Sequence, residues 1–213
     1  MSLVDQTLAE FADEVRGASP APGGGSVAAL SGSLAAALVA MVCRLTAGRP
    51  VYAARETEVL AAMKAADELE ARLLAGVDED TDAYLRVVAA YRLPKGTPEE
   101  AAARRLQIQA AIRAAAEVPL ATAAACLEVL ELAARVSRGF NSSAASDLGV
   151  AVQMAAAGVR GAALNVAINV PSLEDAEVSA ALQRRATEIE ARADALVREL
   201  WATVRSLVED TST

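Results

Sequence analysis

The sequence has no histidine and only two cysteines among its 213 residues. Histidine and cysteine are common ligands of zinc and other transition metals, and two cysteines without histidine cannot build a metal cluster. Cys43 and Cys126 both lie in alanine-rich apolar segments. We therefore expect buried free thiols in a reducing compartment, with a disulfide as the alternative.

Aromatic residues and positive charge are also scarce. Aromatic side chains make up 3% of the chain, although 54% of it is hydrophobic, and much of that fraction is alanine. Alanine is the best helix former, and runs of β-branched residues are rare, so we expect an all-α fold. The net charge of -8 argues against binding to nucleic acid or to an anionic membrane surface.

Long hydrophobic runs and a signal sequence are missing as well. The stretch that most resembles a membrane span, residues 27–43, is uncharged but mostly alanine, and it is interrupted by Ser31, Gly32 and Ser33. It falls short of the ~20 strongly apolar residues of a membrane span, so we interpret it as a buried central helix. The start of the chain lacks the basic and apolar pattern of a signal peptide, which predicts a cytoplasmic protein.

The hydrophobic periodicity predicts a single domain over residues 1–213, built as a bundle of about six helices, some of them long and kinked. Ser26 is expected to cap the second helix, Thr97 with Pro98 to start the fourth, and Pro119 to kink it. Loops rich in glycine and proline separate the helices. The predicted helices cover residues 3–15, 26–48, 52–91, 97–137, 143–169 and 173–208.

The last predicted helix carries a seam of apolar residues at alternating steps of four and three, with one longer gap that holds Val204. Such a seam is typical of helices that pack lengthwise, either in one chain or between two subunits, and it predicts a homodimer. The seam consists of Leu182, Ala186, Ile189, Ala193, Leu196, Leu200 and Leu207.

Asp80 lies on an apolar stripe of the third predicted helix, whereas Asp78 and Asp82 point away and are expected to be solvated. A carboxylate on such a stripe is costly unless it is paired, and burial raises its pKa toward values useful in proton transfer. A structural aspartate bonded to a helix end or an arginine is the alternative. The stripe consists of Leu69, Leu73, Val77, Tyr84, Val88 and Tyr91.

The fifth predicted helix has a face that is polar at both ends and small in its middle. Asp147, Asn165 and Asn169 form the polar ends, and Gly158 and Gly161 lie between them. Glycines inside a helix cost about 1 kcal/mol each relative to alanine, so something approaches closely there. The close neighbour is either a flat ligand or another helix, with the asparagine amides bonding across the contact.

Two further features could bind an anion. Gly23, Gly24, Gly25 and Ser26 precede an apolar helix, where backbone N–H groups and the helix dipole converge, although a plain capped turn has the same composition. Their spacing matches neither the dinucleotide fingerprint nor the nucleotide-triphosphate loop. Lys95 lies in a loop between helices and either meets an anionic ligand or is simply solvated.

Six ordered segments resemble one protein family along nearly the whole chain. They are residues 19–29 (SPAPGGGSVAA), 45–49 (LTAGR), 77–80 (VDED), 93–100 (LPKGTPEE), 146–148 (SDL) and 164–169 (LNVAIN). In this order and spacing the chain resembles the cyclodeaminase/cyclohydrolase family. That family includes the C-terminal domain of formiminotransferase-cyclodeaminase and stand-alone bacterial methenyltetrahydrofolate cyclohydrolases.

The resemblance implies an all-helical bundle that dimerises, and it assigns the proton acceptor to Asp80. It also suggests that a pterin lies against Gly158 and Gly161. In that arrangement the polar groups of Asp147, Asn165 and Asn169 bind the pterin edge. Lys95 and the loop of residues 23–26 would bind the glutamate carboxylates of a tetrahydrofolate derivative. This derivative carries either one glutamate or a polyglutamate tail.

Two reactions are implied by the resemblance. A cyclodeaminase converts 5-formiminotetrahydrofolate to 5,10-methenyltetrahydrofolate and ammonia, and a cyclohydrolase converts the methenyl compound and water to 10-formyltetrahydrofolate. Both need a group that moves protons, and neither needs a metal or a cofactor beyond the folate substrate. The chain lacks a transferase half, so we prefer the cyclodeaminase only slightly. The alternatives are the cyclohydrolase and an inactive helical dimerisation module.

Overall fold

The computed structural model describes residues 2–210, which fold into six α-helices and four short 3-10 turns without a β-strand. The predicted all-α fold with about six helices is confirmed. The helices are α1 (Leu8–Arg16), α2 (Gly24–Thr46), α3 (Glu56–Tyr91), α4 (Pro98–Val136), α5 (Ala145–Asn169) and α6 (Ala176–Asp210). The turns are η1 (Leu3–Asp5), η2 (Pro50–Arg55), η3 (Ser142–Ala144) and η4 (Val170–Ser172).

The start of α4 agrees with the sequence. The Thr97 hydroxyl accepts a hydrogen bond from the N–H of Glu100, and the Glu100 carboxylate accepts one from the N–H of Thr97. This reciprocal pair satisfies two N–H groups that would otherwise lack partners at a helix start. Helix α4 then continues as one element through the buried Pro119.

Two other helix starts differ from the prediction. Residues 3–15 form the separate elements η1 and α1, and the third helix begins at Glu56 after η2. The predicted cap at Ser26 is wrong, because Gly23 is the N-cap of α2 and Ser26 lies inside its first turn, fully buried. The Ser26 hydroxyl is instead directed across to α3, as described below.

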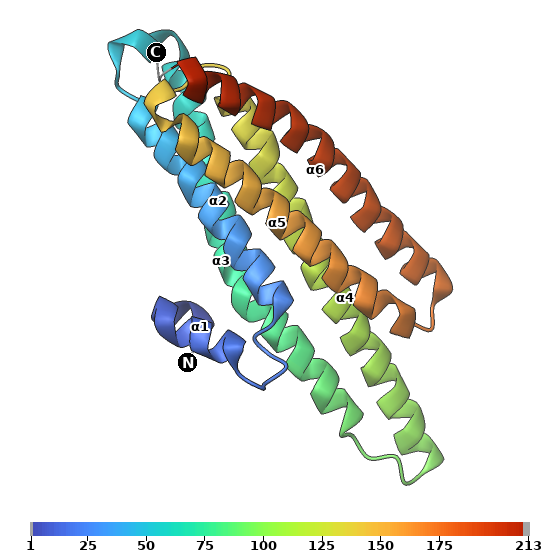
Figure 1. The fold of residues 1–213 in the computed structure, drawn as a ribbon. Coiled ribbons are helices and arrows are strands. Elements are labelled where there is room, and N and C mark those ends of the chain that lie inside the picture. Colours follow the sequence, from blue (N-terminus) through green and yellow to red (C-terminus); the bar gives the residue numbers. More distant parts are fainter. Residues whose placement is uncertain (1, 211–213) are drawn as a thin grey trace.

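Helix α2 is central to the bundle and packs against α3, α4 and α5 (Figure 1). It runs antiparallel to α5: the Ser31 hydroxyl donates to the Met154 carbonyl at 2.8 Å, and the Asn141 N–H donates to the Thr46 hydroxyl at 3.0 Å. The segment interpreted as a buried central helix is largely buried, with Val39 and Val42 fully enclosed. One side of α2 is not covered within the chain, and Leu34 on that side is 43% exposed.

Three helical stretches are long and apolar enough to cross a membrane by length and composition alone. In the most apolar of them, α2, 61% of the relevant window is already buried inside the protein. Burial against neighbouring helices thus accounts for much of its apolar surface.

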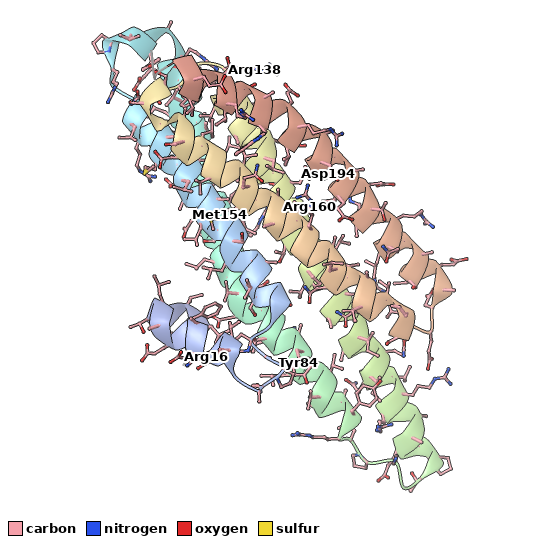
Figure 2. The ribbon with its side chains drawn as sticks, in the orientation of Figure 1. Arg16, Tyr84, Arg138, Met154, Arg160 and Asp194 are labelled. Carbon is pink, nitrogen blue, oxygen red and sulfur yellow. The ribbon has the colours of Figure 1, made fainter. Side chains whose placement is uncertain are left out.

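The seam of α6 is buried within the same chain. Ala186, Ile189, Ala193 and Leu200 are each at most 3% exposed, and α6 packs along α5 and α4. An ion pair between Arg160 and Asp194, 2.6 Å long, links α5 to α6 on the surface (Figure 2). The predicted lengthwise packing is confirmed, but its partners are α4 and α5, so the seam is no argument for a second subunit.

Helix α1 stands apart from the bundle and buries none of its residues (Figure 1). Its attachment is η1, where the Ser2 hydroxyl and the Leu3 N–H both donate to the Asp78 carboxylate, the latter at 2.7 Å. The expectation that Asp78 is solvated is therefore wrong, because it ties the N-terminal segment to α3. Its neighbour Asp82 is exposed as expected.

Both cysteines are buried free thiols, as the sequence predicted. Burial raises the pKa of Cys43 to about 11 and that of Cys126 to about 12. Because the thiolate is the reactive form, both side chains are unreactive near neutral pH and serve as small apolar groups in the core.

Candidate active site

Asp80 on α3 lies directly against the first turn of α2. A Cβ atom added to Gly25 would be 2.6 Å from Oδ2 of Asp80 and closer still to Oδ1. No real Cβ atom can occupy that position, so the carboxylate fills the space that a side chain at residue 25 would need. Glycine at this position is what allows α2 and Asp80 to approach each other.

Ser26 connects α2 to the same stretch of α3. Its hydroxyl lies 2.9 Å from the Val77 carbonyl, 3.2 Å from Oδ2 of Asp80 and 3.2 Å from the Thr81 hydroxyl. Thr81 was not anticipated from the sequence, although it directly follows Asp80. A single hydroxyl proton cannot satisfy every acceptor at once, so Ser26 positions the carboxylate without neutralising it.

Burial raises the pKa of Asp80 above its ordinary value of 3.8. Hydrogen bonds from the Ser26 hydroxyl and backbone N–H act in the opposite direction and only partly offset the desolvation. No arginine or lysine is paired with Asp80 among the ion pairs of the described residues. A half-buried carboxylate without a cationic partner can accept and return a proton, as general acid–base catalysis requires.

The N-terminus of α2 adds open hydrogen-bond donors beside the carboxylate. Gly23 is the N-cap, and the first helical bond of the turn runs from the Val27 N–H to the Gly23 carbonyl at 3.1 Å. No hydrogen bond within residues 2–210 uses the N–H groups of Gly24 or Gly25. Because these groups sit at the positive end of the helix dipole, they can receive a carbonyl or an anionic group.

Asn165 on α5 completes this cluster. Its Nδ2 atom lies 3.5 Å from the position that a Cβ of Gly24 would take, and the same amide donates to the Gly161 carbonyl at 2.8 Å. Asn169 is one turn further along and donates to the Asn165 carbonyl and to the Ala115 carbonyl on α4. Asn165 therefore borders the Asp80 cluster, whereas the amide N–H groups of Asn169 are engaged in joining α5 to α4.

The expected pterin contact at Gly158 and Gly161 is wrong. A Cβ on Gly158 would lie 2.6 Å from Sγ of Cys126 and 3.1 Å from the Ala28 carbonyl. A Cβ on Gly161 would lie 3.2 Å from the Ala28 Cβ. The two glycines thus let α5 pack tightly on α2, which is the helix-packing alternative, and the face they form is filled by protein.

Two other predicted site residues lie away from Asp80. Eleven residues of α3 separate Asp80 from the helix end at Tyr91, about 17 Å, and Lys95 lies exposed beyond it. Asp147 is in the first turn of α5, eighteen residues or about 27 Å from Asn165 along that helix. Within one chain the structure brings together Asp80, the residues 23–26 and Asn165, but not Lys95 or Asp147.

The apolar stripe that singled out Asp80 is buried over only half its length. Leu69, Leu73 and Val77 are in the core, but Tyr84 is 36% exposed and Tyr91 is 53% exposed. Asp80 lies where the stripe emerges at the surface, so its carboxylate is partly desolvated and still accessible to a ligand. Within residues 2–210 no group of three potential metal-ligating side chains occurs.

Comparison with known proteins places this arrangement in context. The family model described as formiminotransferase-cyclodeaminase matches residues 7–188. A methenyltetrahydrofolate cyclohydrolase from Methylorubrum extorquens is 41% identical over 207 residues, which are 96% of this chain and 98% of that protein. The formimidoyltransferase-cyclodeaminase of Rattus norvegicus is 37% identical over 174 residues, 82% of this chain but only 32% of the rat protein.

A solved structure has the same fold. The crystal structure of formiminotetrahydrofolate cyclodeaminase from Thermotoga maritima superimposes with a TM-score of 0.85 at 25% identity, covering 95% of this chain and 98% of that one. The similarity in both sequence and structure extends over nearly the whole chain, including α2, α3 and α5, which form the Asp80 cluster. The chain belongs to the formiminotransferase-cyclodeaminase family.

Proposed function

We propose that this protein is a folate one-carbon enzyme in which Asp80 is the proton acceptor. The observation that carries the proposal is the Asp80 carboxylate itself, which lies against Gly25 and Ser26 with a raised pKa and has no cationic partner among residues 2–210. The relatives act, by their names, on methenyl- or formiminotetrahydrofolate, substrates whose conversion needs proton transfer at a one-carbon bridge.

The reaction we favour is hydrolysis of 5,10-methenyltetrahydrofolate, because the cyclohydrolase from Methylorubrum extorquens matches this chain at full length. Water adds to the methenyl carbon while Asp80 takes one of its protons. N5 of the resulting tetrahedral intermediate receives this proton from Asp80, and its bond to the one-carbon unit breaks. The hydroxyl group becomes the formyl carbonyl as its proton passes to Asp80 and from there to water, and 10-formyltetrahydrofolate leaves. The methenyl bridge of the substrate carries a positive charge, and the negative charge of Asp80 favours the binding of this bridge.

The cyclodeaminase reaction is the second candidate, supported by the fold of the Thermotoga maritima enzyme. Here N10 attacks the carbon of the protonated formimino group, Asp80 moves the N10 proton to the formimino nitrogen, and ammonia leaves as the methenyl cation forms. Both reactions pass through a tetrahedral carbon, so one carboxylate serves either. In both, the open N–H groups at Gly24 and Gly25 and the amide of Asn165 are suited to polar groups of the folate.

An absorbance assay at the methenyl band distinguishes the candidates. A cyclohydrolase removes the band of methenyltetrahydrofolate by hydrolysis, and a cyclodeaminase creates the band from formiminotetrahydrofolate with release of ammonia. Activity in neither direction, in a folded and dimeric preparation, contradicts the proposal and favours a helical module without catalysis. No cofactor other than the tetrahydrofolate substrate enters either reaction as we propose it.

We propose further that the protein is a homodimer formed through α2 and α5, not through α6. The outward faces of these helices expose apolar side chains along their whole length. The exposed fractions are 41% for Val27, 43% for Leu34, 41% for Leu45, 51% for Val150, 71% for Leu164 and 75% for Ile168. The pair is about 35 Å long and about 20 Å wide, so the face covers about 700 Å², close to the roughly 800 Å² per partner of a stable complex.

Such a dimer offers a role for Asp147. Because α2 and α5 are antiparallel, a twofold axis perpendicular to them brings the α5 N-terminus of one subunit beside the α2 N-terminus of the other. Asp147 of one subunit then lies near the Asp80 cluster of its neighbour and can bind the same folate. Lys95, at the far end of α3, remains our candidate for the glutamate tail.

A further inference from the structure

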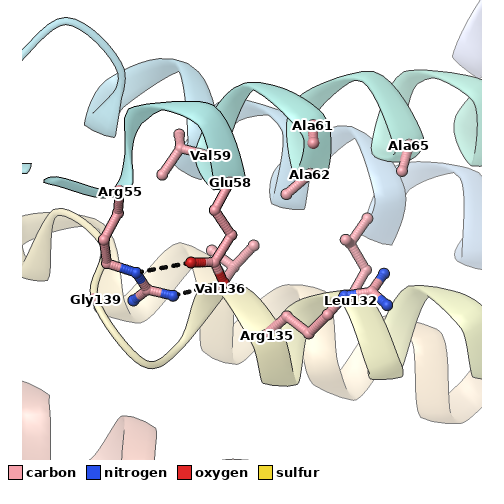
Figure 3. Close-up of a pocket in the computed structure, with 10 residues that line it drawn as sticks. All are labelled: Arg55, Glu58, Val59, Ala61, Ala62, Ala65, Leu132, Arg135, Val136 and Gly139. Atoms are coloured by element: carbon pink, nitrogen blue, oxygen red, sulfur yellow. Dashed lines mark hydrogen bonds and ion pairs between the residues drawn. The ribbon is translucent and has the colours of Figure 1, made fainter. Parts of the chain in front are cut away.

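A cavity lies at the N-terminal end of α3, far from Asp80. It has a volume of about 240 Å³ and lies between the first turns of α3 and the last turns of α4 (Figure 3). Twenty-four residues of α3, or about 36 Å, separate Glu56 at this end from Asp80. The cavity is therefore distinct from the candidate active site.

The walls of this cavity are mainly apolar, and the wall formed by α3 consists mainly of small side chains. Helix α3 presents Ala62 and Ala65, and α4 presents Leu132 and Val136 opposite them (Figure 3). The alanines are too short to fill the gap between the helices, which leaves an elongated slot. Its volume is below the roughly 300–1,000 Å³ of drug-sized sites, so the slot suits a small ligand.

Two arginines and one carboxylate line the cavity: Arg55, Arg135 and Glu58. Arg55 is held in place by two bonds to Glu58, of 3.1 and 2.8 Å, and its guanidinium lies where Gly139 has no side chain. Arg135 lines the cavity, and Arg138 lies close enough for its charge to lower the pKa of Glu58. Arg55 and Glu58 neutralise each other, which leaves the positive charge of Arg135 at the cavity of a chain with net charge -8.

Arg135 and Arg138 make no hydrogen bond or ion pair within the described part of the chain, unlike Arg55. The acid one turn before Arg135, Glu131, is already bound by Arg192 at 2.6 Å. A guanidinium has five N–H donors in a planar fork that matches a carboxylate. Arg135 is thus free to bind an anionic head group at the edge of an apolar slot.

We propose that this cavity binds a small organic carboxylate, with its apolar body between α3 and α4 and its carboxylate on Arg135. Arg138 adds positive potential near Glu58, while Arg55, fixed by Glu58, closes one end. The ligand class is a monocarboxylate with a short aliphatic body. Inorganic anions lack the apolar part, and neutral alcohols lack the charge.

Isothermal titration with hexanoate tests the proposal, with 1-hexanol and inorganic phosphate as controls. We expect hexanoate to bind at least about tenfold more tightly than either control, since a charge-assisted hydrogen bond contributes about that factor. Arg135→Ala should weaken hexanoate binding about tenfold or more without changing folate turnover. Ala65→Leu, at a half-buried position, should fill the slot and weaken hexanoate to the level of phosphate.

The controls decide the outcome in each case. Thermal unfolding shows whether both variants are folded, and Arg135 is a surface residue whose replacement leaves the core intact. Equal binding of hexanol and hexanoate, or hexanoate binding that neither Arg135→Ala nor Ala65→Leu weakens, overturns the proposal. Binding of phosphate as tight as that of hexanoate also overturns it, because the apolar slot would then play no part.

Discussion

Asp80 owes its position to a residue without a side chain. Gly25 leaves room for the carboxylate at the α2 N-terminus, and Ser26 holds it from the adjacent position. Any larger residue at position 25 would push Asp80 or the whole first turn of α2 away. A methyl group added at position 25 would therefore separate the Asp80 carboxylate from the open N–H groups at the start of α2.

Asp80→Asn keeps the shape of the side chain but removes proton exchange. We expect kcat to fall by roughly 10²- to 10⁴-fold, the range typical of lost general acid–base catalysis. Stopped-flow or steady-state absorbance at the methenyl band measures it. Asp82→Asn, two residues away and exposed, is the matched control and should retain wild-type turnover. An Asp80→Asn protein that is folded and fully active would exclude the assignment.

The raised pKa of Asp80 predicts how stability depends on pH. The folded state holds the proton of Asp80 more tightly than the unfolded chain does, in which the pKa of this side chain is near 3.8. Ionisation of Asp80 therefore destabilises the folded state. The wild-type protein loses stability as the pH rises from about 3.8 through the raised pKa of the folded state. The Asp80→Asn variant does not lose this stability, because asparagine does not ionise.

Thermal unfolding of both proteins across this pH range checks the prediction. The Tm of Asp80→Asn minus that of wild type should increase with pH and then level off above the folded pKa. A difference that is constant over the whole range would show that the pKa of Asp80 is the same in the folded and unfolded states.

At the scale of helices, the packing of α5 on α2 depends more on glycine at position 158 than on glycine at position 161. The nearest atoms to an added Cβ on Gly158 include a backbone oxygen, which cannot move without shifting α2. The nearest atom to an added Cβ on Gly161 is the Ala28 Cβ at 3.2 Å, so a small adjustment is enough. An added Cβ on Gly158 would also lie 2.6 Å from Sγ of Cys126, whereas no second atom of another helix lies within 4 Å of an added Cβ on Gly161.

We expect Gly158→Ala to destabilise the protein by about 1–3 kcal/mol, as overpacking does. Gly161→Ala should change stability by less than about 1 kcal/mol, because the helix propensity of alanine offsets the tighter contact. Urea unfolding of both variants gives the comparison. Equal stability of the two would contradict the packing described for α2 and α5.

At the scale of the whole molecule, the α2 and α5 face predicts the oligomeric state. Leu34 is 43% exposed in the middle of this face, and Leu106 is 72% exposed on α4, outside it. Leu34→Glu should convert a dimer to a monomer by burying a charge at the interface. Leu106→Glu should leave the dimer intact. Analytical ultracentrifugation at micromolar concentration measures both, and a monomeric wild type would refute the dimer.

Mixing two inactive variants tests whether the subunits share a site. Neither Asp80→Asn nor Asp147→Asn alone should have appreciable activity if a folate needs both carboxylates. In a random mixture half of the dimers are heterodimers, and each heterodimer has one site with both native residues. The mixture should therefore regain about a quarter of the wild-type activity. No recovery after verified subunit exchange, or a fully active Asp147→Asn, rules out the shared site.

The sequence by itself determined the local features of this protein. The period of the apolar residues predicted six helices, and Thr97 with Pro98 located the start of α4. It also predicted the lengthwise packing of α6 and, through one apolar stripe, singled out Asp80. These features depend on residues within a few helical turns of each other, so the order of residues in the sequence is enough to predict them.

Only the tertiary structure decided which surfaces meet. It placed Ser26 inside α2 because the Val77 carbonyl and Asp80 lie opposite, and it filled the space beside Gly158 with Cys126 and the Ala28 carbonyl. It also separated Asp147 from Asn165 by about 27 Å along α5. Periodicity defines the face of a helix, but the partner of that face depends on how all the helices pack together, which no local pattern contains.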